Sequence, residues 1–179
     1  MYEGCEILSL CSKNLDKLPT ISSNIKFLDI SFNNLEQIND LPEFLEVLHC
    51  NNNNLVELPD NLPDTLQIIY CDNNSIELLP EKLPKSLVRL TCNSNKLVKL
   101  PNRLPDKLKV LYCDNNLITV IPSILPRSLE RIECRQNKLT KLPSYLPRSL
   151  VTIDVSMNYS LQLQLVDNFG TLVSDKIKT

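Results

Sequence analysis

Hydrophobic residues recur along this chain with a period of about 21 residues. Five segments share the frame L-x-x-L-x-C-x-x-N-x-L-x-x-L-P-x-x-L-P-x-x, and they begin at Leu45, Leu66, Leu87, Leu108 and Leu129. Weaker copies begin at Cys5, Ile25 and Leu150, which gives about eight units. A fixed period in this range is typical of a solenoid, in which each unit is one small structural repeat.

The start of each unit alternates between apolar and polar residues, which predicts a short strand with one buried face. The residues expected to point inward are Leu48, Ile69, Leu90 and Leu111, together with Cys50, Cys71, Cys92 and Cys113. Because one short strand cannot bury its apolar face alone, we expect the units to stack as a parallel sheet over one shared core.

An Asn recurs where each predicted strand ends, at Asn53, Asn74, Asn95, Asn116 and Asn137. A side-chain amide at such a turn can satisfy backbone groups that the sheet leaves unpaired. Loss of a buried partner of this kind costs about 1–3 kcal/mol. We therefore expect Asn95→Ala to lower thermal stability more than Asn93→Ala.

The second half of each unit carries the prolines, of which the chain has 12. The stretch L-P-x-x-L-P is incompatible with the interior of a helix, so it predicts an extended, polyproline-like convex side. The absence of Ala and the presence of only 2 Gly agree with a chain built from strands, turns and extended returns. Thin convex segments predict a solenoid that curves gently.

The frame is identified as a leucine-rich repeat. Its L-P-x-x-L-P segment resembles the LPX-type repeats of bacterial type III effectors, and YCDNN, TCNSN and ECRQN resemble the Cys-containing repeats of large DNA viruses of amoebae. The resemblance covers roughly residues 5 to 158 and implies a solenoid with a parallel sheet on its concave face. We assign residues 1–158 to the repeat domain and residues 159–179 to a C-terminal cap or tail. The sequence does not decide between strand and helix for this tail.

The effector family often joins such repeats to a ubiquitin ligase domain with a C-x-D motif. No C-x-D triplet occurs in this chain, so we expect no ligase chemistry and no other enzymatic activity. One alternative that follows from the resemblance is that the chain serves as the recognition arm of a larger, ligase-like effector. The expected function is a protein–protein interaction module.

Seven cysteines would ordinarily suggest disulfides or a metal site. Five of them lie 21 residues apart, and no C-x-x-C occurs. We therefore expect a reduced, buried ladder, no metal and no cofactor, which fits a cytoplasmic location, including the cytoplasm of a host cell. Cys11 falls at an outward position and is expected to be an exposed thiol.

His49 is the only histidine of the chain. The predicted register places Asp29 and Tyr70 at its sides, with no Ser or Cys at that level. Nucleophilic catalysis needs a base beside the nucleophile, so we expect no catalytic role for this residue.

The concave face is the expected binding surface. Its outward positions form two rows, which run from Ser9 to Asp154 and from Ile7 to Thr152. Tyrosine, arginine and exposed aliphatic residues on one rigid sheet are typical of binding hot spots. The residues predicted to bind a partner are Phe27, His49, Ile68, Tyr70, Arg89, Val110, Tyr112, Arg131 and Arg135.

Charge divides the chain into two halves although the total is only −2. Residues 1–84 carry 14 acidic and 4 basic side chains, and residues 85–179 carry 7 acidic and 15 basic ones, so the halves have net charges of −10 and +8. Such a field can steer a partner or favour head-to-tail contact between copies. A second alternative is that the basic half, with Arg89, Lys109, Arg131 and Arg135, binds nucleic acid or phosphate. No apolar run long enough to span a membrane occurs, so no membrane partner is expected.

Overall fold

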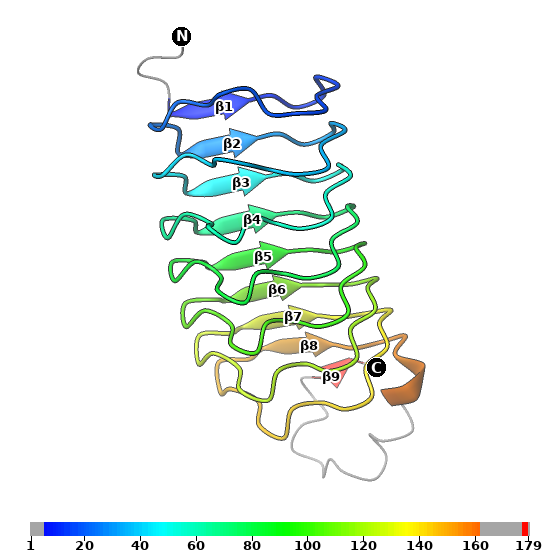
Figure 1. The fold of residues 1–179 in the computed structure, drawn as a ribbon. Helices are drawn as coiled ribbons and strands as arrows, with labels where there is room; N and C mark the ends of the chain where they lie inside the picture. Colours follow the sequence, from blue (N-terminus) through cyan, green and yellow to red (C-terminus); the bar gives the residue numbers. More distant parts are fainter. Residues whose placement is uncertain (1–5, 162–176, 179) are drawn as a thin grey trace.

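The computed structural model describes residues 6–161 and 177–178, and it contains one parallel sheet (Figure 1). The strands lie in the sheet in chain order, each hydrogen-bonded to the next. They are β1 (Ile7–Ser9), β2 (Phe27–Asp29), β3 (Val47–His49), β4 (Ile68–Tyr70), β5 (Arg89–Thr91), β6 (Val110–Tyr112), β7 (Arg131–Glu133), β8 (Thr152–Asp154) and β9 (Ile177–Lys178). The predicted repeat solenoid is confirmed, with strands β1–β8 supplied by the eight units.

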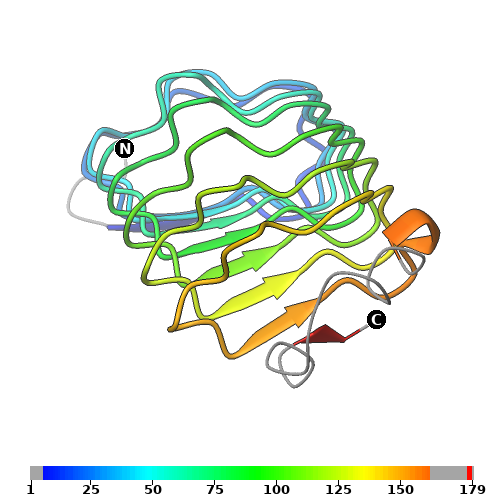
Figure 2. The same cartoon turned by 90° about the horizontal axis from the view of Figure 1, so that it is seen from below.

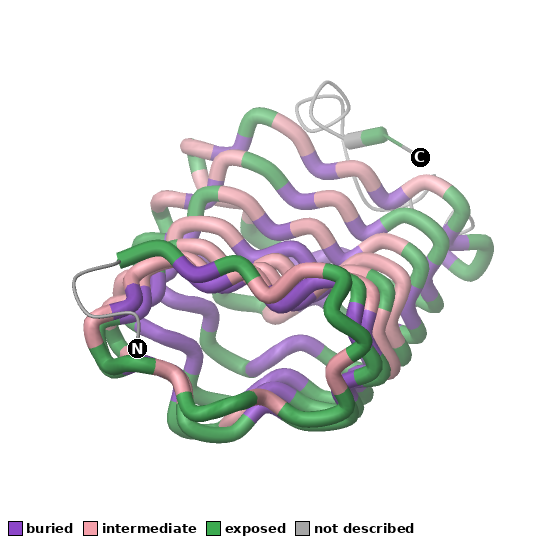
Figure 3. The backbone as a smooth tube through the Cα atoms, turned by 90° about the horizontal axis from the view of Figure 1, so that it is seen from above, coloured by how far each residue is buried: buried purple, intermediate pink, exposed green. Residues whose placement is uncertain are grey.

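The middle residue of each repeat strand points into the core. Leu48 pairs with Leu28 and Ile69 in register, and this column continues through Leu90 and Leu111. All of these side chains are fully buried, as are the five cysteines of the ladder. Figure 3 shows buried and exposed residues alternating along the turns, with the buried positions stacked above one another. One continuous core therefore runs along the solenoid, as the repeat frame predicts.

The recurring Asn side chains join consecutive turns, as expected. Oδ1 of Asn95 accepts a hydrogen bond from the backbone N–H of Ile76 at 3.0 Å. Its Nδ2 donates to three carbonyl oxygens, those of Cys71, Cys92 and Asn93, at 3.0, 3.2 and 3.1 Å. Side chains of the other turns make contacts of the same kind, at Asn33, Asn53, Asn74, Asn116, Asn137 and Asn158.

The residue that precedes each of these Asn side chains adopts left-handed backbone geometry. Its φ lies between 51° and 61° at Phe32, Asn52, Asn73, Ser94, Asn115, Gln136 and Met157. A residue other than Gly pays roughly 1 kcal/mol or more for this conformation, and Asn pays less than most. The turn is therefore held in place by the hydrogen bonds of the Asn that follows it.

The convex side is extended, as the prolines predict. Among the described residues, helical geometry is confined to one turn at residues 159–161. Isolated parallel bridges join neighbouring convex segments, Glu57 to Leu78 and Val120 to Lys141. The strands of Figure 1 stack with little curvature, and Figure 2 shows successive turns rotated slightly with respect to one another.

The C-terminal end of the sheet is extended by β9, which pairs in parallel with β8 through Ile153–Ile177 and Asp154–Lys178. The rest of the predicted cap or tail, residues 162–176 and 179, lies outside the described residues, as do Cys5 and the other residues before Glu6. The described part of the chain contains no helix long and apolar enough to cross a membrane.

Candidate binding surface

Two rows of side chains cover the concave face of the sheet. The strand pairing sets the first and third residues of β1–β8 in two parallel rows, in the register expected from the repeats. Along most of the sheet these residues are half-buried, because each is flanked by neighbours on the adjacent strands. Ile7, Ser9 and Arg131 are exposed. Thr91 is only 3% exposed and donates a hydrogen bond to Asp72. Most of this surface is therefore formed by side chains that are partly exposed.

An aromatic patch lies on β2–β4. The imidazole of His49 packs edge-on between two rings, with its centroid 5.0 Å from that of Phe27 and 4.6 Å from that of Tyr70. Edge-to-face pairs at these distances contribute about 0.5–1.5 kcal/mol beyond the area that they bury. We name Phe27, His49 and Tyr70 the aromatic patch. Half-buried Ile68 lies beside this patch, in the row formed by the first residue of each strand. The structure thus brings together four of the predicted residues.

A cationic patch follows on β5–β7, centred on Tyr112. The guanidinium of Arg89 lies 5.8 Å from the centroid of the Tyr112 ring, and Nη1 of Arg131 donates to the Tyr112 hydroxyl at 3.4 Å. This hydrogen bond is the main cause that raises the pKa of Arg131. Val110 lies between the two arginines in the strand register. We name Arg89, Tyr112 and Arg131 the cationic patch.

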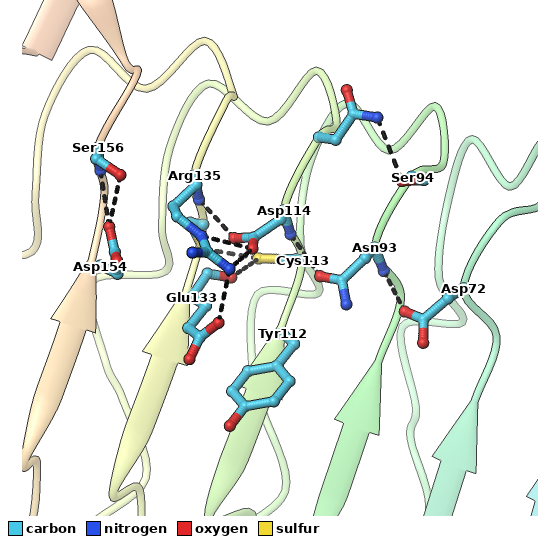
Figure 4. A network of polar contacts seen from close by, with 12 residues as sticks. Asp72, Asn93, Ser94, Tyr112, Cys113, Asp114, Glu133, Arg135, Asp154 and Ser156 are labelled. Carbon is cyan, nitrogen blue, oxygen red and sulfur yellow. Dashed lines mark hydrogen bonds and ion pairs between the residues drawn. The ribbon is translucent and has the colours of Figure 1, made fainter.

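Arg135 lies at the rim of the concave face, where its guanidinium forms ion pairs with two carboxylates (Figure 4). Its side chain contacts Asp114 at 2.7 Å and Glu133 at 3.1 Å. The hydrogen bond to Asp114 is the main cause that raises the pKa of the Arg135 guanidinium. Lys109 is likewise paired with Glu130 at 3.0 Å. Two of the four basic residues proposed for phosphate binding are thus already paired within the chain.

A second hydrogen-bond ladder runs along the ends of the strands, and the sequence reasoning missed it. In four consecutive turns, those of Asn51 to Asp114, the side-chain oxygen of the residue after the Cys accepts a hydrogen bond from the backbone N–H of the equivalent residue in the next turn. The distances are 2.6 Å from Asn93 to Asp72, 2.8 Å from Asp114 to Asn93 and 2.7 Å from Arg135 to Asp114. The recurrence of Asn or Asp after Cys50, Cys71, Cys92 and Cys113 was the signal available in the sequence. Asn93 is therefore a structural residue as well.

Asp72 is the member of this second ladder whose pKa is raised by burial. Burial raises the pKa of its carboxyl above the ordinary value of 3.8, although hydrogen bonds from Thr91 and Asn93 act in the opposite direction. A carboxyl whose pKa is raised by folding destabilises the folded state once the pH is high enough to ionise it. The ionised group is the form present at neutral pH.

We expect Asp72→Asn to raise the midpoint of thermal unfolding at pH 7. The neutral amide keeps an oxygen for the N–H of Asn93, and Asn already occupies this ladder position at Asn51 and Asn93. The gain should shrink as the pH falls and vanish below about 3.8, where the carboxyl is protonated in both states. Thermal melts of both proteins at pH 7 and pH 3 measure this. A difference that is the same at both pH values would contradict it.

The cysteine ladder is buried and free of disulfides. Of the described cysteines, the five on the ladder are fully buried and Cys11 is half-buried, so Cys11 is less exposed than expected. Burial raises the pKa of the Cys50, Cys71 and Cys92 thiols. Each of these thiols donates a hydrogen bond to a backbone carbonyl oxygen of the next strand. A protonated, buried thiol is inert as a nucleophile.

The surroundings of His49 on the concave face are mainly aromatic. His49 contacts two aromatic rings, and the register places Asp29 and Tyr70 beside it, as expected from the sequence. In residues 6–161 and 177–178, no group of three His, Cys, Asp or Glu side chains is arranged to hold a metal ion. The concave face presents aromatic rings, guanidinium groups and aliphatic side chains.

The fold is that of a leucine-rich repeat solenoid, and the chain resembles solved leucine-rich repeat proteins. Among solved structures it is similar to the leucine-rich repeat domain of a Shigella effector, with 28% identity and a TM-score of 0.74 over 97% of this chain and 81% of that one. It is also similar to YopM from Yersinia enterocolitica, with 31% identity and a TM-score of 0.64 over 85% of this chain. A leucine-rich repeat protein of Leptospira interrogans gives 25% identity and a TM-score of 0.66 over 89% of this chain.

The chain spans only part of two of these proteins, 38% of YopM and 53% of the Leptospira protein. No model of a known protein family matches the sequence, and a search of curated proteins gives no match. The likeness therefore lies in the repeat architecture that this chain shares with these proteins.

Proposed function

We propose that this chain is a non-enzymatic interaction module that binds a protein partner through its concave sheet. The observation that carries the proposal is the continuous surface formed by the aromatic patch and the cationic patch. Both patches lie on strands fixed by the core beneath them, so little conformational entropy is lost when a partner binds. Tyr and Arg in such settings are the residues that contribute most to binding.

The similarity to YopM and to the leucine-rich repeat domain of a Shigella effector supports this proposal, because repeat folds of this kind suggest protein–protein interaction. The reduced cysteine ladder supports a cytoplasmic site of action, since buried free thiols suit a reducing compartment. The recognition-arm alternative makes use of the same concave surface, so it predicts the same contact residues.

Binding of nucleic acid by the basic half is the competing proposal. The ion pairs of Arg135 and Lys109 disfavour it, because a phosphate would have to displace their carboxylate partners. Binding of this kind releases counterions and weakens steeply between about 50 and 200 mM salt. Retention of a labelled RNA or DNA oligonucleotide that is lost over this range would favour nucleic acid over a protein partner.

The double variant Tyr70→Ala/Arg89→Ala tests the concave face where the two patches meet. We expect at least about 30-fold weaker binding of a captured protein partner, since two hot-spot truncations cost about 2 kcal/mol or more. Tyr159→Ala/Lys96→Ala is the matched control, because it also removes one tyrosine and one cation, both at exposed positions. Affinities measured by biolayer interferometry that are equal for the two variants would overturn the proposal.

A further inference from the structure

A row of charges follows one lateral edge of the solenoid, where the convex segments lead into the strands. It consists of the residue that follows the last proline of each repeat from the second to the seventh, at Glu43, Asp64, Lys85, Asp106, Arg127 and Arg148. All six side chains are exposed. At a strand spacing of about 4.8 Å the row is about 24 Å long. We name it the edge row.

Consecutive members of the edge row lie on loops that touch one another. The Thr65 hydroxyl donates to the carbonyl oxygen of Glu43 at 3.2 Å, and the Ser128 hydroxyl donates to that of Asp106 at 2.7 Å. Two open grooves follow the same edge. One has a volume of about 940 Å³ and is lined in part by Asp64, Lys85 and Asp106. The other, of about 560 Å³, is lined in part by Arg127 and Arg148.

The order of signs along the edge row is complementary to its own reverse. From Glu43 to Arg148 the charges are negative, negative, positive, negative, positive and positive. When a second row runs antiparallel to the first, every negative charge faces a positive one. The pairs are Glu43 with Arg148, Asp64 with Arg127 and Lys85 with Asp106, and each is formed twice.

Apolar side chains flank the two ends of the edge row. Phe44, beside Glu43, is 52% exposed, while Ile124 and Tyr145, near the arginines, are 78% and 83% exposed. The equivalent of Ile124 and Tyr145 is an exposed polar residue in the third to fifth repeats, at Asn61, Lys82 and Arg103. The fold therefore does not require an apolar residue at this position.

The charges of the edge row are available to a partner. Within residues 6–161 and 177–178, Asp106 is the one member that forms an ion pair, with Arg103 at 3.5 Å. Both of these side chains are more than 80% exposed, and an exposed pair of this kind contributes little to stability. Asp60 and Glu81, the acidic residues of earlier repeats, are replaced by Ser123 and Ser144 near the arginines.

From these observations we propose that a second copy of this chain docks on the edge row, giving an antiparallel dimer with a twofold axis between Lys85 and Asp106. An isologous contact of this type closes on itself, whereas head-to-tail contact between opposite halves would build an open chain of copies. Phe44 of each copy then lies at the same end of the interface as Ile124 and Tyr145 of the other copy. The concave sheets stay uncovered, so the dimer presents two binding surfaces.

Sedimentation equilibrium of the wild-type chain at about 100 µM tests the dimer. We expect a dimer in 0.1 M salt that dissociates in 1 M salt, where the Debye length falls from about 10 Å to about 3 Å. Arg127→Glu/Arg148→Glu should weaken dimerisation by at least about 100-fold, because four like-charge contacts replace four attractive ones. Lys96→Glu/Lys138→Glu changes the net charge equally at exposed positions outside the row and should leave the dimer intact.

Charge exchange makes the test specific. Glu43→Arg/Asp64→Arg should also be monomeric alone, yet a mixture of this variant with Arg127→Glu/Arg148→Glu should form a heterodimer, because all six facing pairs are then opposite in sign. Circular dichroism establishes that each variant is folded. A wild-type chain that stays monomeric in 0.1 M salt, a mass that grows beyond the dimer, or variants that fail to pair when mixed would each overturn the proposal.

Discussion

Replacement of Leu90 by Ala is expected to lower the free energy of unfolding by about 3 kcal/mol. Leu90 lies on β5 at the centre of the solenoid, is fully buried, and is flanked in the inward column by Ile69 and Leu111. The neighbouring turns are fixed by their own hydrogen bonds, so they cannot collapse into the cavity that the truncation leaves. Guanidinium denaturation monitored by circular dichroism measures the change.

Val98→Ala in the same repeat provides the comparison, because Val98 is 45% exposed. Its truncation should change the free energy of unfolding by less than about 0.5 kcal/mol. Equal losses at Leu90 and Val98 would contradict the assignment of inward and outward positions.

Replacement of Asn95 by Ala is expected to cost about 2–3 kcal/mol. The substitution removes four hydrogen bonds and leaves the N–H of Ile76 and three carbonyl groups without their side-chain partner. Because these groups belong to two consecutive turns, the loss loosens the contact between repeats. Thermal and chemical unfolding of the variant measure the effect.

Two further asparagines grade this prediction. Asn93 accepts one hydrogen bond, from the N–H of Asp114, so Asn93→Ala should cost less than Asn95→Ala but should not be neutral. Exposed Asn54 provides the control, and Asn54→Ala should be close to neutral. The expected order of unfolding midpoints is therefore Asn54→Ala, then Asn93→Ala, then Asn95→Ala as the lowest. A different order would contradict the roles assigned to the two ladders.

The fold could be predicted from the sequence because each unit repeats the same pattern of apolar residues, Asn and Pro. The alternation around Leu90 and Cys92 defines a strand, Asn95 marks its end, and the prolines exclude a helix from the return. The same repetition placed Tyr70 beside His49, since a register that is fixed in one pair of strands is fixed in all of them. Buried positions are predictable in this way because the core demands a narrow range of side chains.

Side-chain contacts between the two rows of the concave face, and those at the ends of the strands, could not be predicted in the same way. The packing of Phe27 on His49 crosses from one row to the other, and the rows drawn from the sequence contain no such pair. The ion pairs of Arg135 depend on side-chain rotamers, which the repeat frame does not specify. The second ladder through Asp72 and Asn93 was overlooked because short polar residues at strand ends are also common in exposed turns.

Site-specific photo-crosslinking measures most directly whether the concave face binds the partner. A benzophenone amino acid is placed in turn at Tyr70 and Tyr112 on the concave face, and at Tyr159, which is 73% exposed and follows β8. Each protein is irradiated in cell extract, and the adducts are identified by mass spectrometry. We expect the proteins labelled at Tyr70 and Tyr112 to capture the same partner protein and the protein labelled at Tyr159 not to capture it. Capture of that partner from Tyr159 alone, or equally from all three positions, would contradict it.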